Sequence, residues 1–286
     1  MIATVNPRVS SDLSKGYKTF YNPYSPRGAT SLVFEHIKVY YSLVESFPRN
    51  LMLVMDRRDL RECLNGTRTG FLLSLEGSEA LDDTDDIRIL YNCGLRNLGF
   101  NWNYDTRYSA SCMSKKDYGL TGEGEALLKE MNKLGVIADL AHASKKTCTE
   151  VLASSKMPAI VSHANVKVLF DCARNLDEEV MEALKANGGV MGFIFAKQMM
   201  GGRRNVNELV RHILYVYRHF GPDIMAIGTD YFGLGDERAP DGLEDVTRIR
   251  NLWGILMDKG VKEADIAKIA YQNALRVIEK NATRWR

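Results

Sequence analysis

Two histidines follow apolar runs at matching places in the chain. His142 comes after the run in GVIADLAHAS, and His163 comes after the run in PAIVSHAN, one helical segment later. Glu76 follows a third apolar run, in GFLLSLEGSEA. Neutral imidazoles and carboxylates are the ligands of catalytic zinc sites, which usually leave one position for water. The sequence therefore predicts a Zn²⁺ site built from Glu76, His142 and His163.

Polar residues also end two other apolar runs. Asn101 and Asn103 close LRNLGFNWN, and Asp230 closes IMAIGTDYFG. A parallel α/β barrel presents its catalytic groups at the carboxyl ends of its strands, so five such endings favour a barrel. We expect Asp230 to orient a water or a substrate ammonium. Asp139 is a weaker ligand candidate, because its odd spacing from His142 on a strand sends the two side chains to opposite faces.

Structural alternatives compete with these interpretations. A single histidine after a strand is more often a structural residue than a ligand, and only the repeated pattern with Glu76 and Asp230 favours metal binding. Arg174 is either an exposed charge before a helix or a clamp for a substrate carboxylate, which a guanidinium fork suits. Trp102 is either a core residue or the wall of a pocket. The remaining histidines lie in helical segments, as surface or packing residues: His36, His212 and His219.

The elements that must position these residues alternate along the chain. Seven short segments rich in β-branched residues, most of them preceded by a Gly, Pro or Asp turn signal, predict strands. They are 2–5, 70–75, 97–101, 135–141, 158–162, 189–195 and 224–229. Helical spacing occupies 123–134, ended by Gly135, and 176–186, with Asn175 as its N-cap. Helices are also expected at 204–219, 244–259 and 262–280. We interpret residues 1–286 as one α/β domain, a TIM-type (β/α)8 barrel that is incomplete with seven recognisable strands.

Composition excludes several classes of protein. The 286 residues are 45% hydrophobic, which suffices for a large core, and the net charge of +2 favours neither nucleic acid nor an anionic membrane as partner. No apolar stretch approaches the roughly 20 residues of a membrane span. The start, MIATVNPRVSS, lacks the regions of a signal peptide. Five cysteines without metal-binding spacing predict reduced, mostly buried thiols and a cytoplasmic protein.

Together these motifs resemble the renal (membrane) dipeptidase family of zinc metallopeptidases. SLEGSEAL, LRNLGFNWN, GVIADLAHAS, PAIVSHANVKVL and AIGTDYFG stand in the family's order, and the resemblance covers about residues 70–280. It implies a (β/α)8 barrel that hydrolyses dipeptides with a metal-activated water. It also implies that Glu76 bridges two zinc ions and that His142 and His163 complete one metal position. By the same resemblance Arg174 grips the substrate carboxylate, and Asp230 assists the water and the substrate amine.

The chain departs from the family pattern in two places. Trp102 stands where mammalian members have a histidine at the reaction centre, so the resemblance places Trp102 and Asn103 beside the substrate. The family's first strand ends in a His-x-Asp pair that ligates the other zinc, and this chain has no such pair. MIATVNP resembles the family's second strand. We therefore expect an N-terminally truncated barrel that keeps one metal position and has weak or no activity unless another segment or chain fills the gap.

Three functions remain open from the sequence. The first is zinc-dependent hydrolysis of a small dipeptide. The second is a catalytically inactive family remnant that binds a small amino-acid-like ligand. The third is another metal-dependent amidohydrolase, which a bridging lysine at a strand end would favour. The expected partner is the dipeptide, and a homodimer is a further option that the sequence leaves open.

Overall fold

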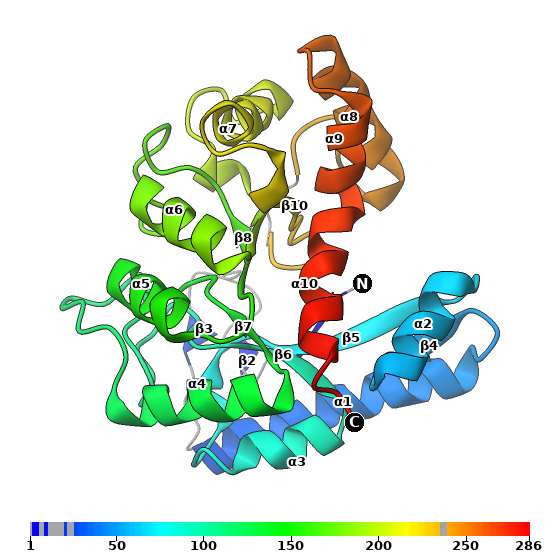
Figure 1. The fold of residues 1–286 in the computed structure, drawn as a ribbon, viewed down its shortest axis with the longest axis vertical. Helices are drawn as coiled ribbons and strands as arrows, with labels where there is room; N and C mark the ends of the chain where they lie inside the picture. Colours follow the sequence, from blue (N-terminus) through cyan, green and yellow to red (C-terminus); the bar gives the residue numbers. More distant parts are fainter. Residues whose placement is uncertain (1, 6–8, 11–19, 22–25, 235–238) are drawn as a thin grey trace. The chain divides into compact units, whose positions relative to one another are not determined.

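The computed structural model describes residues 2–5, 9–10, 20–21, 26–234 and 239–286 (Figure 1). The chain divides into two compact units. Unit 1 comprises Met1–Pro158 and Ile278–Arg286, and unit 2 comprises Ala159–Val277.

Parallel strands form the sheet of unit 1. Strand β5 (Thr69–Leu75) lies between β1 (Ile2–Val5) and β6 (Leu95–Gly99), and β6 pairs with β7 (Ile137–Asp139). Strand β4 (Leu51–Leu53) pairs with the first half of β5, and β1 pairs with the second half. Six consecutive residues of β5 are buried, as expected for a parallel strand that is covered on both faces. A short antiparallel pair joins β2 (Val9–Ser10) and β3 (Phe20–Tyr21).

Helices follow the strands of unit 1. Helix α4 agrees with the helix predicted from the spacing of its apolar residues. Leu127, Leu128 and Met131 are buried on one stripe, and Gly135 ends the helix with a left-handed φ of 72°. The helices of this unit are α1 (Pro26–Ser46), α2 (Arg57–Asn65), α3 (Asp86–Asn92), α4 (Gly122–Leu134) and α5 (Lys145–Ser154), with a 3-10 turn η2 (Ser78–Ala80).

Unit 2 repeats the alternation of strand and helix. Its parallel strands are β8 (Ile160–Ala164), β9 (Val190–Phe193) and β10 (Met225–Ile227), with β9 pairing with both others. A Cβ at Gly192 would lie 2.2 Å from the carbonyl oxygen of Ser162, so the close approach of β8 and β9 requires a glycine there. The helices are α6 (Glu178–Asn187), α7 (Val206–His219), α8 (Ile249–Asp258) and α9 (Glu263–Ala267), with shorter turns η3 (Lys197–Met199), η4 (Pro222–Ile224), η5 (Val246–Arg248) and the π-helical η6 (Lys268–Gln272). Helix α10 (Asn273–Ala282) begins in unit 2 and ends in unit 1, because the division falls after Val277.

The structure confirms the α/β class and all seven predicted strands, as β1 and β5–β10. Strand β4 was not predicted. The helices that contain His36, His212 and His219 are also confirmed, as α1 and α7.

Two predictions about individual residues were wrong. Asn175 is not the N-cap of α6, because the helix begins after Asp177, and the Asn175 amide instead bonds to Asn165 N and to the Phe170 and Met199 carbonyls. None of the five cysteines is paired in a disulfide, as predicted, but only Cys148 is fully buried.

Candidate metal centre

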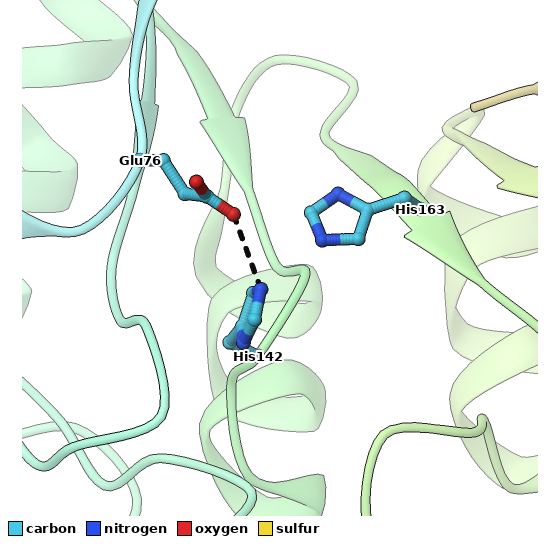
Figure 2. Close-up of side chains that lie close together, drawn as sticks. All are labelled: Glu76, His142 and His163. Carbon is cyan, nitrogen blue, oxygen red and sulfur yellow. Dashed lines mark ion pairs between the residues drawn. The ribbon is translucent and has the colours of Figure 1, made fainter. Parts of the chain in front are cut away.

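Unit 1 places Glu76 and His142 side by side. Glu76 directly follows β5, and His142 comes three residues after β7. The Nε2 atom of His142 lies 3.2 Å from Oε1 of Glu76, and Figure 2 marks this contact with a dashed line. The His142 side chain is only 7% exposed and that of Glu76 is 21% exposed. Two residues 66 positions apart in the sequence thus meet because their parallel strands end at the same edge of the sheet.

Asn103 orients the His142 ring. Its Oδ1 lies 2.8 Å from Nδ1 of His142. A proton on Nδ1 that is donated to this amide oxygen leaves the lone pair of a neutral imidazole on Nε2, the atom that faces Glu76. A lone pair and a carboxylate oxygen at 3.2 Å repel each other unless a cation or a proton lies between them. Metal-binding histidines have this arrangement, with the second ring nitrogen bonded to an oxygen of the protein.

The backbone of His142 is held in an uncommon conformation. Its φ is 70°, in the left-handed region that costs a non-glycine residue on the order of 1–3 kcal/mol. The Cys112 N–H donates to the His142 carbonyl over 2.7 Å, and Ser111 forms a β-bridge with Ala143. The loop after β6 therefore fixes both the side chain and the main chain of His142.

Unit 2 carries the other predicted site residues. His163 is the fourth residue of β8, slightly earlier than its predicted place after the strand, and its Nδ1 lies 2.9 Å from Ser162 Oγ. Arg174 is half-buried, and its Nη2 donates to the His163 carbonyl at 3.5 Å. Asp230 comes three residues after β10 with a φ of 54°, and its carbonyl accepts from Gly233 N.

Glu76, His142 and His163 form the one group in the described part of the chain with three side chains suited to a metal ion. One ligand atom from each residue lies within 4.8 Å of the other two (Figure 2). Both histidines have an oxygen atom within hydrogen-bonding distance of Nδ1, from Asn103 and Ser162. When Nδ1 donates to that oxygen, Nε2 keeps its lone pair for a ligand. Two imidazoles and a carboxylate are a donor set that suits Zn²⁺.

Other predicted residues have roles beside this group. Asp139 is not in the group: its carboxylate accepts from Asn97 Nδ2 and Ala141 N, in agreement with its lower rank as a ligand. Trp102 is half-buried, and its ring centroid lies 5.9 Å from that of His142. The sequence did not predict the contact of Ser162 with His163 or the hydrogen bond from Cys112 N to the His142 carbonyl. The second is a bond between backbone groups, so no residue type indicates it.

Comparison with known proteins identifies the family of this chain. The family model described as membrane dipeptidase (peptidase family M19) matches residues 12–285. A dipeptidase, verJ, of Clonostachys rogersoniana is 29% identical over 249 residues, which are 86% of this chain and 64% of that protein. The chain thus spans a little under two thirds of the length of this relative.

Solved structures have the same fold. A dipeptidase AC of family M19 aligns with a TM-score of 0.85 and 21% identity, over 99% of this chain and 85% of that one. A metallopeptidase of Rhodobacter sphaeroides, solved with a phosphinate mimic of L-Ala-D-Ala, has a TM-score of 0.82 and 22% identity, over 90% and 76% of the two chains. Both likenesses agree with the predicted barrel fold. Within the described residues, no helix is long and apolar enough to cross a membrane.

Proposed function

Since the chain belongs to the membrane dipeptidase family, we propose that it is a zinc-dependent dipeptidase. The group of Glu76, His142 and His163 carries this proposal, because its three ligand atoms lie within 4.8 Å of one another. The fit to a metal rests on the donor set and on the lone pair that Asn103 directs toward Glu76. A zinc ion held there would supply Lewis acidity, polarising the scissile carbonyl and lowering the pKa of water.

Two side chains of unit 2 would then bind the two charged ends of a dipeptide. We assign Arg174 to the terminal carboxylate, since its half-buried guanidinium retains donors besides the one used on the His163 carbonyl. Asp230, which comes three residues after β10 and has a φ of 54°, would accept from the substrate ammonium and orient the attacking water. Trp102 and Asn103 would line the substrate site, Asn103 through its contact with His142.

We also propose that the chain has one strong metal position. The His-x-Asp pair of the family pattern is missing from the sequence, and the described residues contain one three-ligand group. A single position would weaken hydrolysis, so a family remnant that only binds an amino-acid-like ligand is the alternative function. A homodimer and a cytoplasmic location are subsidiary proposals, to be tested by light scattering and by cell fractionation.

Elemental analysis and dipeptide hydrolysis on the same preparation test the proposal. We expect one zinc ion per chain together with turnover, and loss of both in His163→Ala. The matched control is His219→Ala, because His219 is exposed on α7 and bonds to Tyr215. Equal metal content in the wild type and in His163→Ala would remove the metal assignment. Bound zinc without hydrolysis of any dipeptide would favour the inactive binder.

A further inference from the structure

Two aromatic rings extend from the candidate metal centre along the loop after β6. The Trp102 ring centroid lies 5.9 Å from that of His142, with the planes 36° apart. The Tyr104 ring lies 5.4 Å from Trp102, tilted by 57°. Trp102 is half-buried, and Tyr104 is 41% exposed. The two rings form an aromatic surface, Trp102 and Tyr104, that begins at a predicted metal ligand and continues outward to solvent.

Hydrogen bonds fix the loop that carries this aromatic surface. Asn101 is fully buried, and its Nδ2 donates to the Tyr104 and Ser109 carbonyls at 3.3 and 3.0 Å. Ser109 Oγ donates back to Asn101 Oδ1 at 2.7 Å, and Asp105 accepts from Ser111 N at 2.8 Å. A surface held in this way needs little ordering when a ligand binds, so more of the contact energy remains as affinity.

The chemistry of the surface selects one kind of side chain. An aromatic or large aliphatic group on Trp102 and Tyr104 would leave water and gain contact with two rings. A glycine or alanine in the same place would gain little. The carboxylate of Asp105 accepts from Ser111 N and Ser114 Oγ, and the guanidinium of Arg107 donates to Glu123 on α4, so both groups already have protein partners.

We infer that the site prefers dipeptides with one large apolar or aromatic residue, whose side chain lies on Trp102 and Tyr104. This inference rests on the proposed function, because the surface has this role only if the neighbouring group activates a dipeptide. It makes Tyr104 a specificity residue, with its ring and not its hydroxyl as the contributing part.

Four dipeptides separate the two substrate positions: Phe-Gly, Ala-Gly, Gly-Phe and Gly-Ala. We expect one phenylalanine dipeptide to exceed its alanine counterpart in kcat/KM by about 10-fold or more. Tyr104→Ala should reduce that ratio by about 3- to 10-fold, the range of one aromatic pair, and Tyr104→Phe should retain it. Met113→Ala is the control, because Met113 is 57% exposed on the same loop and belongs to neither ring contact.

The possible failures are distinguishable. Hydrolysis of all four dipeptides without preference, or an unchanged ratio in Tyr104→Ala, would overturn the inference and leave the proposed function intact. If no dipeptide is hydrolysed, the proposed function fails, and calorimetric binding of the same four dipeptides tests the surface. Equal Kd values for the phenylalanine and alanine dipeptides would then overturn it. Unchanged metal content and thermal midpoint in Tyr104→Ala exclude a folding defect.

Discussion

The hydrogen bond between Asn103 and His142 offers a sharp test of the metal centre. Asn103→Ala removes the oxygen that lies 2.8 Å from His142 Nδ1. His142 is 6% exposed, so little water can replace the lost acceptor. The ring is then free to carry its proton on Nε2, the nitrogen that the metal needs.

The size of the effect follows from this geometry. Residues that orient a metal-binding histidine typically contribute 10- to 100-fold to metal affinity, which corresponds to about 1.4–2.7 kcal/mol. We therefore expect the Kd for zinc to rise by about 10- to 100-fold in Asn103→Ala. Asn103→Asp keeps an acceptor at this position and should bind zinc at least as tightly as the wild type.

Competition with a chromophoric chelator at pH 7.5 measures these constants directly. Asn251→Ala is the matched control, because the Asn251 amide also makes a 2.8 Å hydrogen bond, to the Gly242 carbonyl on the exposed side of α8. A Kd in Asn103→Ala within twofold of the wild type would show that this bond neither orients His142 for a metal nor keeps the lone pair on Nε2.

Three other changes have defined outcomes. Arg174→Ala should raise KM for dipeptides by roughly 10- to 100-fold, the value of a charge-assisted hydrogen bond, with metal content unchanged; a normal KM would exclude Arg174 as the carboxylate clamp. Gly233→Ala would place a Cβ 2.2 Å from Oδ1 of Asp230 and displace the carboxylate. We therefore expect kcat to fall at least 10-fold with little change in thermal midpoint, and full activity would contradict a role for that carboxylate. Burial lowers the pKa of His212 below its ordinary value of 6.5, so this residue's contribution to stability is complete above pH 6.5 and is lost as pH falls below it. His212→Gln should flatten the decline of Tm between pH 7.5 and 5.5, whereas His219→Gln, on the surface, should not.

The strands could be predicted because their signal is local. A run such as GFLLSL is apolar throughout and bounded by turn residues, and β5 is buried over nearly all of its length. Strand β4 has no such run: it is three residues long, only Met52 is fully buried, and it pairs with only half of β5. Its existence depends on a neighbour 18 positions downstream, since Leu51 pairs with Thr69, and sequence spacing carries no trace of that pairing.

The candidate metal ligands could also be predicted from local sequence, but the residues that hydrogen-bond to them could not. Each of the three candidate ligands, Glu76, His142 and His163, follows or ends an apolar run. A parallel barrel carries its catalytic groups at the carboxyl ends of its strands, so this position identifies them as candidates. The contact of Asn103 with His142 depends on how the loop after β6 folds back. Asn175 illustrates the opposite error, because a residue with the right type for an N-cap bonds to three distant backbone groups instead. Local sequence patterns indicate where a residue lies relative to a strand or a helix, but its hydrogen-bond partners depend on the tertiary structure.

Backbone strain in the structure occurs at two of the residues that the sequence predicted to be functional. Among the described residues, three non-glycines have positive φ: His142, Asp230 and Arg204. Two of these, His142 and Asp230, are the residues that the sequence predicted as a metal ligand and as a catalytic residue. A left-handed conformation at each costs on the order of 1–3 kcal/mol and persists only where surrounding contacts fix it, as the Cys112 and Gly233 amides do here. A histidine and an aspartate that served only packing could relax toward ordinary φ, so the cost retained at both favours a site that needs their side chains in these positions.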